Sequence, residues 1–332
     1  MNITVVLCTY NRCESLAKTL ESIGASRVPE NIVWEVLVVD NNSTDQTRQI
    51  VEDFCRRDPI HFRYLLETNV GKSHALNAGV SKALGEVLVF TDDDVVVEPT
   101  WLRNLTSSLG GEEWAGAGGR TLPAHPFSAP RWLPLEGPYS MKGVLALFDR
   151  GNQAGILDVP PYGVNMAFRR GMFENYGVFR TDLGPSPNLE IPRPNEDTEF
   201  GRRLLAAGER LRYEPSAVVY HPVPEDRLKK RYFLAWWFDY GRALIREKGR
   251  QREIWGIPRY LISIPNMVIT YLSVRALQWL IAFRGQERFY RKCVVWKIGG
   301  EIVETYRQAQ SQMSTMQTPT EQPGRQIKVK TS

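Results

Sequence analysis

The chain is expected to form an α/β domain with a doubly wound, mostly parallel sheet, followed by a C-terminal helical extension that associates with a membrane. Two observations predict this fold class. Over about the first hundred residues, short apolar runs rich in β-branched residues alternate with segments of helical periodicity, as in right-handed β-α-β units. The last third of the chain instead interleaves basic with aromatic residues, which is typical of helices at a membrane surface.

Four apolar runs are expected to be strands of the sheet: residues 3–8, 34–39, 61–66 and 85–91. Such runs are typical of parallel strands that are covered on both faces. Helices are expected after Arg12 and Thr44. Asn11 and Ser43 are interpreted as their N-caps, because a short polar side chain can accept a hydrogen bond from a first-turn amide. Residues 71–80 are interpreted as a loop that enters a helix.

Ligands of doubly wound sheets bind outside the carboxyl ends of the strands. Several polar residues should therefore gather along this edge of the sheet: Thr9, Asp40, Lys72 and Asp92 to Asp94. No Gly-x-Gly-x-x-Gly follows the first strand, and Gly71-Lys72-Ser73 has Leu66 where a P-loop requires glycine. A dinucleotide oxidoreductase or a P-loop NTPase is therefore not expected.

Three consecutive aspartates, Asp92 to Asp94, directly follow the apolar run of residues 85–91. Carboxylates this close repel one another, and leaving them unpaired at a strand end costs free energy. Mg²⁺ or Mn²⁺ removes that cost, because these cations prefer oxygen ligands and bind through one or two carboxylates plus substrate phosphates. The sequence predicts a site for a divalent cation and a diphosphate. A solvated acidic turn is the alternative.

A second acidic cluster, Glu196, Asp197 and Glu199, lies in the first turn of a helix expected to begin near Asp197 and to end at Gly208. Carboxylates at this position suit the positive end of the helix dipole, so ordinary capping explains them without any chemistry. The functional alternative makes one of them a general base for a hydroxyl group. The metal site predicted upstream favours the base.

Residues 210–221 are interpreted as two short strands around a turn at Pro215-Ser216, with His221 at the end of the second strand. A single histidine is more often structural or exposed than a ligand. At this position its imidazole can also complete a site made of carboxylates and a metal, or contact a phosphate.

Six segments, taken together and in this order, resemble the family-2 glycosyltransferases with the GT-A fold: residues 5–12, 38–45, 91–94, 162–170, 196–200 and 218–221. The resemblance covers roughly residues 1 to 225. Residues 91–94 match the Asp-x-Asp metal motif of the family, residues 162–170 its acceptor-side segment, and residues 196–200 its Glu-Asp base motif.

The resemblance implies an inverting transfer from a nucleotide-diphosphate sugar, most often a UDP-sugar, to a glycan or lipid-linked acceptor. It implies a set of donor-binding residues: Thr9, Asn11, Arg12, Asp40, Lys72, Asn77, Asp92 and Asp93. Mn²⁺ or Mg²⁺ would be held by Asp92, Asp94 and His221. Asp197 would be the catalytic base, with Glu196 as the second catalytic residue, and Asn165 and Glu199 would lie on the acceptor side.

The chain departs from the family at one position. Many members carry an arginine just before the asparagine that matches Asn77, and this chain has Leu76 there. Lys72 is the cation that could serve the diphosphate instead, although an ammonium group does not reproduce a bidentate guanidinium.

Residues 110–157 are rich in Gly, Pro and Trp, and we expect loops that shape the acceptor pocket. The four cysteines show no metal or redox spacing, which indicates reduced thiols in a cytosolic setting. Expected domains are residues 1–225 as the catalytic domain, 226–307 as the helical extension, and 308–332 as a disordered tail. Truncation before Asp226 is expected to leave a soluble core, unless the extension packs on it.

From Asp226 to Lys297 the chain has 16 Lys and Arg against 5 Asp and Glu, with aromatics interleaved in residues 231–238. This composition indicates contact with an anionic membrane on its cytoplasmic face. The acidic edge of the sheet argues against a nucleic acid as partner. Residues 257–283 are largely apolar but interrupted, so interfacial or re-entrant helices are expected rather than a spanning helix. A soluble helical cap is the alternative.

Two other functions fit parts of the pattern. A metal-dependent sugar-nucleotidyltransferase would share the sheet and the metal site, but such enzymes generally carry a glycine-rich loop after the first strand, and residues 9–12 contain no glycine. A non-catalytic membrane scaffold would keep the fold but would have lost its acidic clusters, and both clusters are present.

Overall fold

The computed structural model describes residues 1–185, 195–249, 253–254 and 257–316. Its centre is a sheet with the strand order β3-β2-β1-β4-β8-β6-β9-β5, in which β7 also pairs with β9. The strands are β1 (Asn2–Thr9), β2 (Val33–Asp40), β3 (Phe62–Leu66), β4 (Val87–Thr91), β5 (Val96–Val97), β6 (Gly116–Pro123), β7 (Gly155–Leu157), β8 (Met166–Arg169) and β9 (Leu211–His221). The first four strands run parallel, and β8 joins them in the opposite direction.

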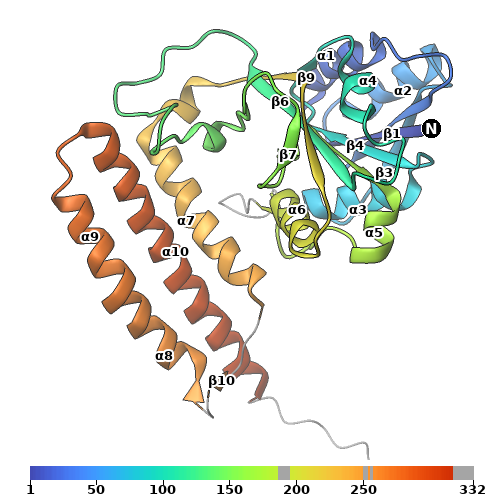
Figure 1. Cartoon of the computed structure of the whole chain (residues 1–332). Helices are drawn as coiled ribbons and strands as arrows, with labels where there is room; N and C mark the ends of the chain where they lie inside the picture. Colours follow the sequence, from blue (N-terminus) through green and yellow to red (C-terminus); the bar gives the residue numbers. More distant parts are fainter. Residues whose placement is uncertain (186–194, 250–252, 255–256, 317–332) are drawn as a thin grey trace, which may run out of the picture.

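Helices cover both faces of this sheet (Figure 1). One face carries α1 (Cys13–Gly24), α2 (Thr47–Arg57) and α4 (Trp101–Thr106), and the other carries α3 (Lys72–Lys82), α5 (Arg170–Tyr176) and α6 (Glu196–Ala206). Alternate strand residues point to opposite faces, so Val5 packs in the first core and Val6 in the second. The doubly wound α/β fold predicted from the sequence is confirmed.

The strand register brings the predicted edge together. Thr9 at the end of β1 pairs with Asp40 at the end of β2, and Leu7 pairs with Thr91 at the end of β4. Asp92 to Asp94 therefore begin where β1 and β2 also end.

The N-cap prediction was wrong for both helices. Arg12 and Gln46 occupy the cap positions, and neither side chain bonds a helix amide. Instead, the Asn11 amide donates to Ser43 Oγ at 2.9 Å and the Thr44 amide donates to Asn11 Oδ1 at 2.7 Å. The two polar side chains thus join the loops that follow β1 and β2, a contact that local sequence patterns do not contain.

One strand, β9 (Leu211–His221), replaces the two strands expected over residues 210–221. Its pairing with β6 shifts between Gly119, opposite Glu214, and Arg120, opposite Val218. The three residues between these partners form a bulge, so Pro215 and Ser216 interrupt the register without ending the strand.

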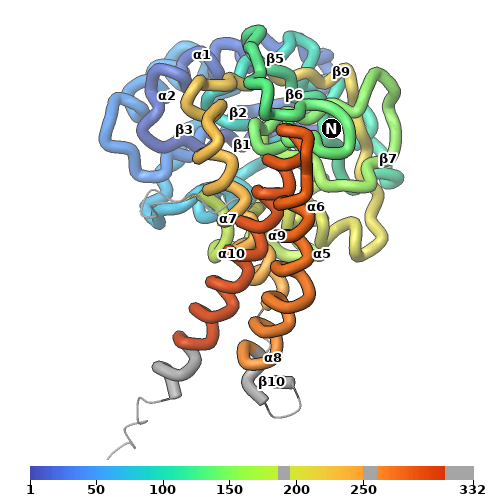
Figure 2. The backbone as a smooth tube through the Cα atoms, turned by 90° about the vertical axis from the view of Figure 1, so that its left-hand side faces the viewer, coloured from blue at the N-terminus to red at the C-terminus, as the bar shows by residue number. Residues whose placement is uncertain are grey.

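The extension begins with the 3-10 turn η2 (Glu225–Leu228) and α7 (Lys230–Glu247), followed by the short strands β10 (Glu253–Ile254) and β11 (Ile257–Pro258). A continuous helical stretch then comprises α8 (Arg259–Asn266), the π-helix η3 (Met267–Leu272) and α9 (Ser273–Leu280). The last helix, α10 (Gly285–Met316), continues beyond Gln308, where the disordered tail was expected to begin. Residues 317–332 lie outside the described residues. Figure 2 shows α9 and α10 side by side, extending beyond the α/β domain.

Apolar packing crosses the domain boundary expected at residue 225. A third core, the cap core, combines residues of the 133–147 segment with residues of α7 and α10: Leu133, Met141, Val144, Leu145, Leu147, Phe233, Phe289 and Cys293. Phe233 and Leu145 are fully buried in it. The extension therefore packs on the α/β domain, which is the exception that the sequence prediction allowed.

Candidate functional site

A cavity of about 480 Å³ opens at the carboxyl ends of β1 and β4, beneath η2 and α7. Nine of the residues predicted from the sequence line it: Thr9, Arg12, Lys72, Asp92, Asp93, Asp94, Glu196, Asp197 and His221. The two acidic clusters, about a hundred residues apart in the sequence, thus face the same space. One wall comes from strand ends and the other from the first turn of α6.

A metal-binding constellation lies at the end of β4. Ligand atoms of Asp92, Asp94 and His221 are all within 4.8 Å of one another. Oδ1 of Asp94 and Nδ1 of His221 are buried and have no hydrogen-bond partner in the part of the chain that the structure describes. Two carboxylates and an imidazole are suitable ligands for Mn²⁺ or Mg²⁺. The residues present therefore fit a divalent cation.

Two cations flank the aspartates. Lys72 Nζ lies 2.6 Å from Asp92 Oδ1 and 3.9 Å from a carboxylate oxygen of Glu196. Arg12 Nη1 lies 3.2 Å from Asp93 and 2.7 Å from Asp94. These pairs offset part of the repulsion within the cluster.

The pKa values reflect this arrangement. Burial alone would raise the pKa of Asp92, but the nearby cation Lys72, with His221 and Arg12 adding to its effect, lowers the pKa overall. Burial raises the pKa of Asp93 to about 6, because Arg12 opposes it only in part. Burial would lower the pKa of Lys72, but Asp92 and Glu196 raise it, so the ammonium group keeps its charge.

The two acidic residues at the start of α6 have different surroundings. Asp197 Oδ2 accepts a hydrogen bond from the Gly163 amide at 2.5 Å, and its Oδ1 accepts from the Thr198 amide at 2.6 Å. Accepting on both oxygens suits an ionised carboxylate. Burial, and then the charge of Asp197, raises the pKa of Glu196 to about 8, with Lys72 opposing. A carboxyl with this pKa is mostly protonated at neutral pH, whereas both Asp197 oxygens accept hydrogen bonds.

Five predicted residues are not among those that line the cavity: Asn11, Asp40, Asn77, Asn165 and Glu199. Asp40 is buried and accepts hydrogen bonds from the Ser43 amide and from Tyr64 Oη. Asn11 makes the loop contact described above. Asn77 bonds both the amide and the carbonyl of Phe179, so it ties α3 to the segment after α5.

The two predicted acceptor-side residues are engaged elsewhere. Asn165 accepts from Trp101 Nε1 at 2.8 Å and donates to the carbonyls of Arg120 and Ala217, across the bulge of β9. Glu199 forms an ion pair with Arg203 on α6.

Several lining residues were not identified from the sequence. Tyr10 and Asn41 follow the first two strands, and Gly143, Val144 and Ala146 come from the segment expected to shape the acceptor pocket. The extension contributes Arg227, Tyr232 and Trp236. The sequence contained a signal for Tyr232 and Trp236, because residues four positions apart share one face of a helix. The basic and aromatic run was interpreted as a membrane surface only.

Comparison with known proteins gives consistent results. Residues 4–177 match the family model described as "Glycosyl transferase family 2". The chain is 30% identical over 264 residues to the succinoglycan biosynthesis protein ExoM of Rhizobium meliloti, covering 77% of this chain and 80% of that protein. It is 26% identical over 233 residues to the glycosyltransferase AglE of Haloferax volcanii, covering 70% of each.

Among solved structures, the mannosyltransferase PcManGT of Pyrobaculum calidifontis, in complex with GDP-Man and Mn²⁺, superposes with a TM-score of 0.59. The alignment covers 92% of this chain and 87% of that one, at 19% sequence identity. At this identity the likeness concerns the fold.

Proposed function

The chain belongs to glycosyl transferase family 2 and is a glycosyltransferase, and from this premise we propose that it performs an inverting, metal-dependent transfer from a nucleotide-diphosphate sugar to a hydroxyl of a glycan or lipid-linked acceptor. The observation that carries the proposal is the convergence of both acidic clusters on one cavity. The relative ExoM, a succinoglycan biosynthesis protein, supports a role in polysaccharide synthesis. A UDP-sugar is the first donor to test.

The donor would occupy the side of the cavity formed by strand ends. Asp92, Asp94 and His221 would hold the cation, which when bound neutralises charge on the leaving diphosphate. Lys72 would supply the cation for the diphosphate in place of the arginine that many family members carry at the position of Leu76, and its ammonium lies 2.6 Å from Asp92. We assign Thr9 to the nucleoside side, with Asn11 and Asp40 holding the loop that follows it.

Asp197 would act as the base on the other side. It would take the proton of the acceptor hydroxyl as that oxygen bonds to the anomeric carbon, while the bond from that carbon to the diphosphate oxygen breaks. Attack from the face opposite the leaving group inverts the anomeric centre, and one carboxylate activates the nucleophile, as in inverting glycosidases. Glu196, protonated at neutral pH, would donate a hydrogen bond rather than compete for the proton. We assign Asn165 and Glu199 to support, because their contacts are structural.

The donor half is tested with a panel of UDP-, GDP- and TDP-sugars, measuring thermal stabilisation and metal-dependent hydrolysis with MnCl₂ or MgCl₂. One donor class should stabilise the protein only when metal is present. Asp92→Asn combined with Asp94→Asn should abolish that stabilisation, whereas Asp158→Asn, an exposed aspartate paired with Arg150, should preserve it. Calorimetry that finds unchanged donor affinity in the double variant would exclude the metal assignment.

We also propose that the extension contacts the cytoplasmic face of a membrane. The stretch Tyr260–Leu280 spans 21 residues with mean hydropathy 1.2, so by length and composition it could cross a bilayer, and none of it is buried in the protein. This stretch lies within residues 257–283, for which the sequence predicted interfacial or re-entrant helices rather than a spanning helix. Large apolar side chains are exposed along it and just beyond it: Leu261, Ile269, Tyr271, Leu277, Leu280 and Phe283.

Basic residues near an anionic surface contribute about 1 kcal/mol each and are screened by salt, whereas apolar burial is not. Binding of the full-length protein to phosphatidylserine-containing liposomes should therefore fall only partly at high ionic strength. Complete recovery in the soluble fraction, with no liposome binding at low salt, would contradict the membrane assignment.

A further inference from the structure

The residue before the acidic pair of α6 has an unusual backbone. Asn195 has φ 105° and ψ 6°, and its side chain does not cap α6. Non-glycine residues adopt positive φ rarely, and a strained backbone of this kind persists only where surrounding contacts hold it in place. Asn195 comes directly before Glu196 and Asp197 in the chain. Its backbone angles therefore set the direction in which α6 begins, and with it the direction of the Asp197 side chain.

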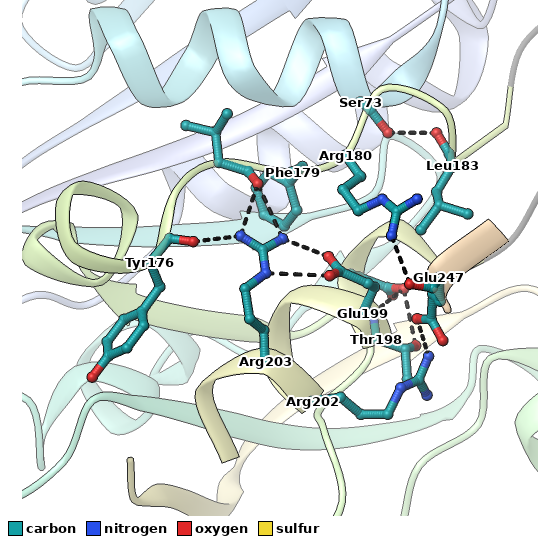
Figure 3. A network of polar contacts seen from close by, with 12 residues as sticks. Ser73, Tyr176, Phe179, Arg180, Leu183, Thr198, Glu199, Arg202, Arg203 and Glu247 are labelled. Atoms are coloured by element: carbon teal, nitrogen blue, oxygen red, sulfur yellow. Dashed lines mark hydrogen bonds and ion pairs between the residues drawn. The ribbon is translucent and has the colours of Figure 1, made fainter. Parts of the chain in front are cut away.

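The compensating contact comes from the far end of α7. Asn195 Nδ2 donates to Glu247 Oε1 at 3.2 Å, and the same carboxylate forms an ion pair with Arg202 on α6. The Glu247 side chain is only 12% exposed. One carboxylate from the extension thus holds both the residue before α6 and the second turn of α6. Figure 3 shows Arg202 and Glu247 facing each other across these elements.

Glu247 is itself fixed in place. Arg180, in the segment after α5, donates to the backbone carbonyls of Arg246 and Glu247 at 2.8 and 3.0 Å. The same segment is tied to α3, since Ser73 Oγ donates to the Leu183 carbonyl at 2.7 Å (Figure 3). The end of α7 is therefore connected to the helix that carries Lys72, as well as to the helix that carries Asp197.

We propose that Glu247 is a positioning residue, which holds Asn195 in its left-handed conformation and thereby aims the Asp197 carboxylate into the cavity. The proposal rests on the proposed function, because it takes Asp197 as the base. It also gives the helical extension a part in the reaction: α7 packs along α10, so a shift of this helix pair relative to the sheet moves Glu247 relative to Asn195.

The test compares Glu247→Ala and Glu247→Gln in the full-length protein. The control is Asp182→Asn, which breaks a carboxylate–Arg180 pair of the same network without touching Asn195. Turnover is measured with the nucleotide sugar found in the donor screen. Affinity for UDP and GDP is measured with MnCl₂, and hydrogen–deuterium exchange reports on the Gly163 amide, which donates to Asp197.

Glu247→Ala should lower turnover about tenfold, since small displacements of catalytic groups have effects of this size or larger. It should leave nucleotide affinity within about twofold and speed exchange at Gly163. Glu247→Gln keeps an acceptor for Asn195 and should lose less. Asp182→Asn should resemble the native protein. Equal losses in Glu247→Ala and Asp182→Asn, or no loss in either with unchanged exchange, would overturn the proposal.

Two further variants test the backbone argument even if Glu247→Ala fails to fold. Asn195→Ala removes the hydrogen bond to Glu247 but still requires positive φ of a non-glycine residue, so it should lose turnover as Glu247→Ala does. Asn195→Gly should keep most of the native turnover, because glycine adopts positive φ freely. Equal turnover in the two variants would refute the backbone role. Asp197→Asn separates the two proposals. If Asp197→Asn retains turnover, the base assignment fails. If Asp197→Asn loses turnover but the Glu247 and Asn195 variants do not, the positioning role fails and the base assignment stands.

Discussion

The two walls of the cavity are built in different ways. On the side that we propose for the donor, called the donor wall, Thr9 ends β1 and Asp92 to Asp94 follow β4, in a register set by backbone hydrogen bonds along β1, β2 and β4. On the side that we propose for the acceptor, called the acceptor wall, the lining comes from the start of α6, the 143–146 segment and α7, which are joined by side-chain contacts. The donor wall is therefore organised by the sheet, whereas the acceptor wall depends on packing between segments far apart in the sequence.

This difference predicts that the largest effect comes from removing the extension. A chain ending at residue 225 would lose Arg227, Tyr232 and Trp236 from the cavity and would expose the apolar residues of the cap core. Each fully buried leucine or phenylalanine exposed costs about 1.5 to 3 kcal/mol, against a total stability of about 5 to 15 kcal/mol. The truncated chain should aggregate or unfold readily, as assayed by size-exclusion chromatography and thermal melting. A monomeric core that melts like the full chain would show that the walls are independent.

Asp197→Asn should have the next largest effect, and it should be confined to the acceptor wall. An amide cannot accept the hydroxyl proton, so turnover should fall by about 10²-fold or more. Donor affinity, measured by calorimetry with MnCl₂, should change little because the strand-end residues are untouched. If turnover barely changes, the capping interpretation of α6 is favoured, and if donor affinity collapses, the two walls are not separable.

The same difference explains what the sequence could reveal. Strand-end residues follow recognisable apolar runs, and parallel strands place their ends together, so the aspartates and Thr9 could be assigned to one edge. Asn11 and Ser43 show the limit: each has the residue type of an N-cap, but the neighbouring loop offers a competing partner across 32 positions of the chain. Local pattern does not record such a partner.

The acceptor wall could be predicted only in part. The acidic pair at the start of α6 was visible, because carboxylates cluster before an apolar helical face. The spacing of Tyr232 and Trp236 puts them on one helix face, but the surface that this face covers depends on α7 packing against residues 133–147. The same limit applies to Glu247, whose contact with Asn195 joins residues 52 positions apart.

A smaller effect is expected at Gly163, whose backbone amide contacts the Asp197 carboxylate. A Cβ added at Gly163 would lie 2.9 Å from Asp197 Oδ2, so Gly163→Ala should push the carboxylate aside without opening the sheet. Turnover should fall by about tenfold, as small displacements of a catalytic group do, while donor affinity and melting temperature stay close to native. Gly171→Ala is the matched control, because a Cβ there meets nothing within 4 Å. Equal turnover in both variants would mean that Asp197 tolerates the shift.

The smallest effect concerns the pH dependence of stability, through Glu196. This carboxyl is buried against Lys72 of α3, Asp92 at the end of β4 and Asp197 of its own helix, and its pKa is raised to about 8 from an ordinary value of 4.5. Between these two values the folded protein keeps a proton that the unfolded chain has released. The unfolded state then binds fewer protons, so the free energy of unfolding falls as pH rises. The contribution is full below pH 4.5 and lost as pH passes 8.

Urea unfolding with EDTA present, from pH 5 to 8.5, should show this decline in the native protein and a flatter curve in Glu196→Gln, whose amide does not titrate. Parallel curves would place the proton elsewhere in the cluster. They would also remove the reason for preferring Asp197 over Glu196 as the base, because that preference depends on Glu196 staying protonated while its neighbour accepts.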